Sequence, residues 1–112
     1  MGVLDDFAAA RPEAVLRPGD EWFVAAEAAP DLVAEAYRQG VKVLGLEGFL
    51  IDGASTYPAL SRIADFSSDR PEVANRRALD LLSGGWSSPP TSVDQISSLA
   101  SRRHMIAVVL DE

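Results

Sequence analysis

The chain has 112 residues, of which 47% are hydrophobic and 24% are charged, and its formal net charge is −7. This length and composition predict a single globular domain spanning residues 1–112, with enough apolar residues for a core of its own. The sequence contains no cysteine, which excludes a disulfide scaffold, a zinc site built from thiolates and a cysteine nucleophile.

The negative charge and the absence of long apolar runs limit the partners to be expected. A negative field repels phosphate backbones and anionic lipid surfaces, so we expect neither nucleic acid nor a membrane as a direct ligand. No hydrophobic run approaches the length of about 20 residues that spans a bilayer, and the first residues lack the basic and apolar regions of a signal peptide. We therefore expect a cytoplasmic protein.

Acidic residues are concentrated in the first half of the chain. Residues 1–56 hold 10 acidic and 4 basic residues, whereas residues 57–112 hold 7 and 6. An acidic half could speed association with a basic protein partner, because complementary fields raise association rates. The plain alternative is that the charge maintains solubility.

Local patterns predict the first elements in chain order. Residues 3–10 predict a short helix, and the aromatic and β-branched residues 21–26 predict a strand. Apolar residues at i, i+4 spacing predict an amphipathic helix over 30–39, with Gly40 as its stop.

The central part of the chain is rich in apolar residues and glycine. Residues 41–46 form a near-continuous apolar run, which is typical of a central strand covered on both faces. Gly45 and Gly48 interrupt the run as candidate bulges, after which residues 49–51 predict a second strand and residues 52–58 a turn-rich loop.

In the second half, the pattern over 60–66 fits either a return strand or a short helix, and we favour a strand. The later patterns predict a helix over 71–82, a loop at 83–92, a short helix over 92–101 and a buried strand over 105–110. Strand, helix and strand over residues 21–46 form a βαβ unit, whose crossover is long enough for a parallel pair. The predicted fold is therefore of the α/β (α+β) class, with a single-layer mixed sheet that contains the βαβ unit and packs with three to four short helices.

The sequence carries no motif of esterase or nucleotide-binding chemistry. It lacks Gly-x-Ser-x-Gly, the phosphate loop and Gly-x-Gly-x-x-Gly, and the stretch from Gly45 to Gly48 is too short for the last of these. It also lacks the spacing of an EF-hand. We therefore expect neither a cofactor nor a bound metal.

Four carboxylates flank the strands placed centrally, namely Glu47, Asp52, Asp65 and Asp69. Two of them at the right separation could serve as general acid and base. Alternatively, all four could simply occupy solvated strand ends. The only histidine, His104, follows two arginines at the start of the last strand, where an ordinary surface histidine is expected.

Two aromatic residues are candidate anchors for a protein partner. Trp86 lies in a loop rich in glycine, serine and proline, and aromatic residues on loops are frequent interface hot spots. The alternative is that Trp86 folds back over the helix at 71–82. Tyr57 is the second candidate anchor, whereas Trp22 at the start of a strand is expected in the core.

Two segments in the middle of the chain together span about a quarter of its length. They are Val43-Leu44-Gly45-Leu46-Glu47-Gly48-Phe49-Leu50-Ile51-Asp52-Gly53 and, after a short loop, Ile63-Ala64-Asp65-Phe66-Ser67. They resemble segments of small acidic bacterial immunity proteins from polymorphic-toxin systems. The resemblance implies a non-enzymatic protein that binds a cognate toxin domain from the same cell and blocks it.

The predicted function is therefore inhibition of a protein partner, with no catalytic residues. The predicted partner-binding residues are Glu47, Asp52, Tyr57, Asp65, Asp69 and Trp86. Two alternatives remain: a small hydrolase or isomerase that uses carboxylates near strand ends, and a regulatory protein-interaction domain.

Overall fold

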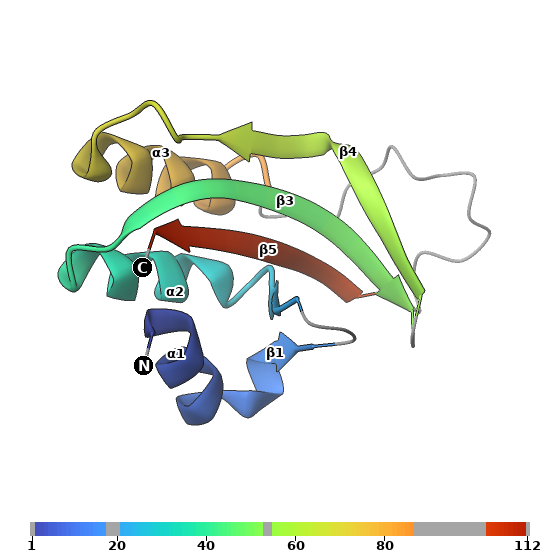
Figure 1. Ribbon diagram of the computed structural model, residues 1–112. Helices are drawn as coiled ribbons and strands as arrows, with labels where there is room; N and C mark the ends of the chain where they lie inside the picture. Colours follow the sequence, from blue (N-terminus) through green and yellow to red (C-terminus); the bar gives the residue numbers. More distant parts are fainter. Residues whose placement is uncertain (1, 18–20, 53–54, 87–102, 112) are drawn as a thin grey trace.

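The computed structural model describes residues 2–17, 21–52, 55–86 and 103–111 (Figure 1). The elements in chain order are α1 (Val3–Ala10), the 3-10 turn η1 (Pro12–Ala14), β1 (Val15–Leu16), β2 (Phe23–Ala25), α2 (Ala29–Arg38), β3 (Lys42–Asp52), β4 (Ser55–Asp65), α3 (Pro71–Ser83) and β5 (Arg103–Asp111). Helices combined with one antiparallel sheet make an α+β fold, which confirms the predicted class. The predicted loop at 83–92 and helix at 92–101 lie mostly outside the described residues.

The described strands form one sheet in the order β1-β2-β5-β3-β4, and every neighbouring pair is antiparallel. The expectation of a mixed sheet is therefore wrong. Strands β2 and β3 do run in the same direction with α2 between them in sequence, but β5 lies between them in space and pairs with both. The βαβ unit is thus split by the last strand, which local periodicity could not reveal because it carries no information about strand order.

Strand β3 is continuous over 11 residues, where the sequence predicted two strands. Its pairing shifts register next to the two glycines: between Val43 and Gly45 against β5, and between Glu47 and Phe49 against β4. The glycines therefore mark irregularities within one strand, as expected of bulges. Figure 1 shows β4 bending near its middle, opposite the second shift.

Strand β4 confirms the strand predicted at 60–66 but begins earlier, at Ser55. Asp52 pairs with Ser55, so the predicted loop over 52–58 is a tight hairpin between β3 and β4. The correction has a simple physical basis, because Thr56 and Tyr57 both favour extended backbone.

Helix α2 ends in a Schellman motif, as Gly40 suggested. Gly40 adopts a φ of 72°, and its amide donates to the Tyr37 carbonyl at 3.1 Å. The next amide, that of Val41, donates to the Ala36 carbonyl at 2.8 Å. These two bonds satisfy the last helical carbonyls and turn the chain directly into β3.

Most of the core lies between α2, α3 and one side of the sheet, but residues 105–108 of β5 are all buried, so both faces of the sheet are covered there. The two helices contact each other and β3, and most buried apolar side chains join a single cluster. Within it, Leu32 and Val33 of α2 and Ala78 of α3 are fully buried beside Leu46 of β3. The other side of the sheet is left partly open near the end of β4.

Candidate functional site

Five residues from β3, β4 and β5 form what we call the open face: Gly45, Glu47, Ile63, Asp65 and Val109. Gly45 is directly opposite Asp65 on β4 and Val109 on β5. Glu47, two residues further along β3, is directly opposite Ile63. Because directly paired residues and residues two apart point to the same side of a sheet, all five share one face.

The open face exposes large apolar side chains to solvent. Ile63 is 58% exposed and Val109 is 44% exposed, whereas Leu46 and Val108, which point to the opposite side, are 0% and 6% exposed. The core therefore lies behind Leu46 and Val108. Ile63 on the edge strand β4 and Val109 on β5 therefore leave apolar surface exposed on this side of the sheet.

A hollow of about 280 Å³ lies on the open face, and all five residues line it. Gly45 contributes no side chain, whereas Asp65 and Val109 rise on either side of it, about 10 Å apart across two strand spacings. A Cβ added at position 45 would lie 3.0 Å from the backbone oxygen of Ala64. The glycine thus provides both the floor of the hollow and the close approach of β3 to β4.

The carboxylate of Asp65 is held in its ionised form by its neighbours. The Ser67 amide donates a hydrogen bond to Asp65 Oδ1 at 2.9 Å, and this bond is the main reason that the pKa of Asp65 is lowered. The Ser67 side chain lowers this pKa further, desolvation opposes the change, and the positive charge of Lys42 adds to it. Asp65 therefore presents a negative charge throughout the physiological range of pH.

Three acidic side chains elsewhere in the described part of the chain form close pairs with arginines, whereas others, such as Asp5, Asp6 and Asp80, belong to no salt bridge. The pairs are Arg11 with Asp31 at 2.8 Å, Arg77 with Asp69 at 2.6 Å, and Arg38 with Glu35. Neither Glu47 nor Asp65 belongs to a salt bridge among the described residues. The open face thus combines exposed aliphatic side chains with two carboxylates that form no salt bridge among the described residues, although Lys42 acts on Asp65 from a greater distance.

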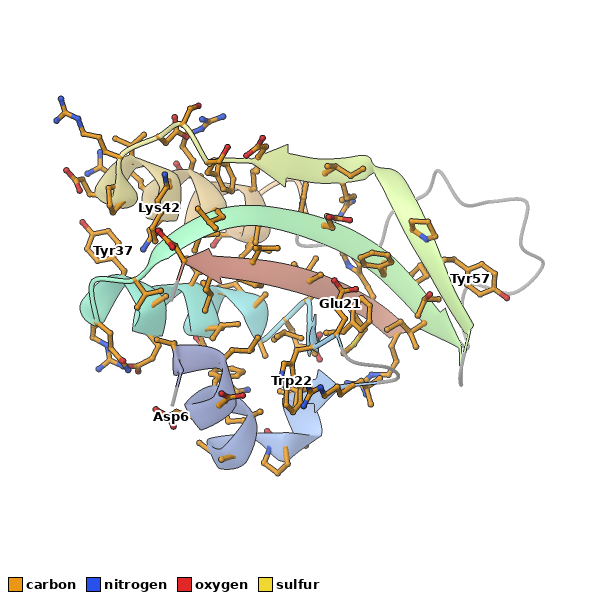
Figure 2. The ribbon with its side chains drawn as sticks, viewed as in Figure 1. Asp6, Glu21, Trp22, Tyr37, Lys42 and Tyr57 are labelled. Carbon is orange, nitrogen blue, oxygen red and sulfur yellow. The ribbon has the colours of Figure 1, made fainter. Side chains whose placement is uncertain are left out.

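The structure brings together only two of the predicted partner-binding residues, Glu47 and Asp65. Asp69 lies in the turn after β4, where it pairs with Arg77. Tyr57 is half-buried on β4, and Figure 2 shows it at the far end of the sheet from Lys42, where β3 begins. Asp52 ends β3, and its side chain lies outside the described part of the structure.

Trp86 adopts the packing alternative that the sequence left open. Its side chain is 7% exposed and belongs to the core cluster, and its amide donates to the Leu81 carbonyl at 2.9 Å. The guanidinium carbon of Arg62 lies 5.9 Å from the centre of its ring. The ring is therefore not exposed as an anchor for a partner, and we correct that expectation.

His104 is partly buried rather than an ordinary surface residue. Its Nε2 atom is buried and has no hydrogen-bond partner among the described residues. Burial, and next the positive charge of Arg62, lower the pKa of His104 to about 4, with Glu27 acting in the opposite direction. The neutral imidazole therefore belongs to the packing between β5 and its neighbours.

Sequence reasoning missed three residues of the open face. Ile63 and Val109 lie in runs that predict strands, the second of them buried, and Gly45 was interpreted only as a bulge. A signal was nevertheless present, because Glu47 and Asp65 each stand two residues from one of these positions along the same strand. The pairing of β3 with β4 was needed to show that these residues of the two strands lie side by side.

The largest described hollow has a different character. It has a volume of about 590 Å³ and lies between α1 and α2. The charged residues that line it carry both signs: Asp6, Arg11, Asp31, Glu35 and Arg38. Two of its acidic residues, Asp31 and Glu35, already pair with these arginines. The charges in this hollow therefore largely compensate one another.

Comparison with protein-family models, with curated proteins and with solved structures finds no match to this chain. Among the described residues, no three histidine, cysteine or acidic side chains are grouped as a metal site would require. No helix in the described ranges has the length and apolar character needed to cross a bilayer.

Proposed function

We propose that this protein is a non-enzymatic inhibitor that binds a cognate bacterial toxin domain, as an immunity protein does, and that it binds through the open face. One observation carries the proposal: exposed Ile63 and Val109 lie beside Glu47 and Asp65, two carboxylates without a salt bridge in the described structure. Apolar contacts surrounded by charges of one sign are suited to binding a protein of opposite charge.

The net charge of the chain supports a basic partner. At −7, it attracts a positively charged protein from a distance, and this attraction raises the rate of association. Exposed aliphatic side chains then slow dissociation, because they are removed from water in the complex. The two kinds of residue therefore contribute to different rate constants, and an effective inhibitor needs both.

The alternative of a carboxylate-dependent hydrolase or isomerase involves the same hollow. Glu47 and Asp65 do line one cavity, as this alternative requires. However, a general acid needs a raised pKa in order to hold its proton at neutral pH, whereas the pKa of Asp65 is lowered. The lowered pKa favours a role in binding a cation, so the carboxylates support the inhibitor more than the enzyme.

The proposal is tested by capturing the partner and then disrupting the open face. The full chain, tagged and expressed in its native strain, is purified at low salt, and the proteins that remain bound are identified. Ile63→Arg should abolish capture, whereas Val73→Arg should retain it. The control adds the same charge at a residue of α3 that is 41% exposed.

A second measurement separates an immunity protein from a regulatory interaction domain. The captured protein is expressed alone, with the wild-type chain and with the Ile63→Arg variant, and cell growth is followed. We expect the partner to be toxic alone and to be neutralised only by the wild type. Absence of a partner, equal capture by both variants, or a harmless partner would contradict the proposal. A gene for a large secreted protein with a toxin-like end directly upstream would support it.

A further inference from the structure

We propose that the hollow over Gly45 receives an arginine side chain of the protein partner. In this arrangement, the aliphatic stem packs against Val109 and Ile63, and the guanidinium group forms charged hydrogen bonds with Asp65 and Glu47. The inference rests on the proposed function, because it specifies what the partner presents to the open face.

The size of the hollow fits one side chain. This hollow has a volume of about 280 Å³, at the lower limit of the about 300–1,000 Å³ typical of small-molecule pockets, and it opens on the surface of a sheet. Because Gly45 lacks a side chain, an inserted group can reach the backbone of β3 between Asp65 and Val109. A side chain at this position would fill the hollow from within.

The chemistry of the lining favours a long cationic side chain with an apolar stem. Val109 lies opposite Asp65 across Gly45, and Glu47 lies next along β3. A stem of methylene groups can therefore pack on Val109 and Ile63 while its charged end reaches the carboxylates.

Arginine matches this arrangement better than lysine. The planar guanidinium group has five N–H donors directed along several edges, so it can contact two carboxylates that approach from different directions. The lysine ammonium group is compact and more strongly hydrated, and it behaves as a point charge. Because each carboxylate oxygen can accept more than one hydrogen bond, Asp65 can still accept from a guanidinium group while it is bound by Ser67.

Lys42 and Arg62, two cations on the strands of the open face, have other contacts. Lys42, whose charge acts on Asp65, donates to the Ser67 carbonyl at 2.7 Å. Arg62 lies near the ring of Trp86 and beside Gly48. No described cation forms a salt bridge with Glu47 or Asp65, which leaves both carboxylates available to a cation of the partner.

The inference is tested with a small probe on the purified full chain. The probe is the peptide acetyl-Gly-Arg-Gly-amide, and the readout is the change in backbone amide chemical shifts at low ionic strength. We expect saturable shifts at Gly45, Glu47, Asp65 and Val109. The citrulline peptide, which keeps the shape without the charge, should bind at least about fivefold more weakly, and the lysine peptide should lie between the two.

Two charge-matched double variants locate the binding. The double variant Glu47→Gln with Asp65→Asn should bind the arginine peptide at least about fivefold more weakly. Asparagine at position 65 can still accept the hydrogen bond from the Ser67 amide. Asp5→Asn with Asp6→Asn removes the same charge from exposed positions on α1 and should leave affinity unchanged. Equal loss in both variants, equal binding of citrulline, or shifts away from the open face would overturn the inference.

The outcome is distinguishable from failure of the proposed function. If the captured partner is lost in Ile63→Arg but retained when both Glu47 and Asp65 are neutralised, binding through the open face stands and the arginine inference is wrong. If no partner is captured at all, the proposed function itself fails, whatever the peptide does.

Discussion

Asn75 of α3 and Val43 of β3 are joined by a buried hydrogen bond, in which the Val43 amide donates to Asn75 Oδ1 at 2.8 Å. The same side chain donates through Nδ2 to the Val41 carbonyl at 2.9 Å. Asn75 is 2% exposed and is the only buried polar residue among those described. It thus satisfies two backbone groups where the chain leaves α2 and enters the sheet.

Replacing Asn75 with alanine should destabilise the fold strongly. The substitution leaves the Val41 carbonyl and the Val43 amide without their partner, and each unsatisfied buried group costs about 1–3 kcal/mol. We expect the free energy of unfolding to fall by about 2 kcal/mol or more, measured by urea denaturation. Arg76→Ala, at the exposed neighbouring position, should change stability little, and equal effects of the two variants would contradict this account.

Gly48→Ala should also destabilise the protein, for a steric reason. A Cβ at position 48 would lie 2.7 Å from the Cβ of Arg62 and 3.3 Å from its Cγ. The crowded atoms are close to the backbone of β4, so they cannot move aside as the end of a flexible side chain could. We expect a loss of about 1–3 kcal/mol in unfolding free energy.

The matched control for position 48 is Gly85→Ala, because no atom lies within 4 Å of a Cβ added at position 85. This variant should melt close to the wild type. Combining Gly48→Ala with Arg62→Gly removes the crowded Cβ and should recover part of the loss attributed to the clash. A Gly48→Ala protein as stable as the wild type would show that β3 and β4 separate at little cost.

The sequence predicted the kinds of elements well because the signals for them are local. Proline at the start of α3, glycine after α2 and the apolar runs of β3 and β5 all act within a few residues. The insertion of β5 between β2 and β3 depends on contacts across the whole chain, and so does the burial of Trp86. These features therefore could not be deduced from spacing or composition.

In the candidate site, too, some features follow from local sequence and others only from strand pairing. The carboxylates Glu47 and Asp65 were identifiable as polar residues beside apolar strands, but their shared face required the register of β4 on β3. Ile63 and Val109 have the same composition as core residues, and only the pairing shows that they point away from the helices. Strand pairing, rather than residue type, separates a binding surface from a core here.

Stability should decrease on mild acidification because of His104. Its pKa falls from an ordinary value of 6.5 to about 4 in the folded protein, so the unfolded chain binds a proton more readily between these values. The stabilising contribution is therefore complete above 6.5 and is lost as the pH falls toward 4. Urea denaturation at about pH 7 and about pH 5 should show a lower unfolding free energy at the lower pH.

The variant His104→Phe isolates this contribution, because the phenyl ring keeps much of the shape and cannot bind a proton. Its unfolding free energy should change less between the two pH values than that of the wild type. The change in unfolding free energy that remains in the variant between the two pH values is the contribution of the carboxylates. Identical pH dependence of variant and wild type would show that His104 titrates alike in the folded and unfolded states.

The two tryptophans should respond differently to truncation. Trp86 is 7% exposed in the core, with Arg62 beside its ring, so Trp86→Ala should cost about 3–5 kcal/mol through the cavity that it leaves. Trp22 was expected in the core, but it is half-buried, with the guanidinium carbon of Arg17 4.9 Å from its ring centre. Trp22→Ala should therefore cost clearly less. The melting temperatures of both variants provide the comparison. If Trp86→Ala melted like the wild type but no longer bound its partner, Trp86 would be an interface anchor after all.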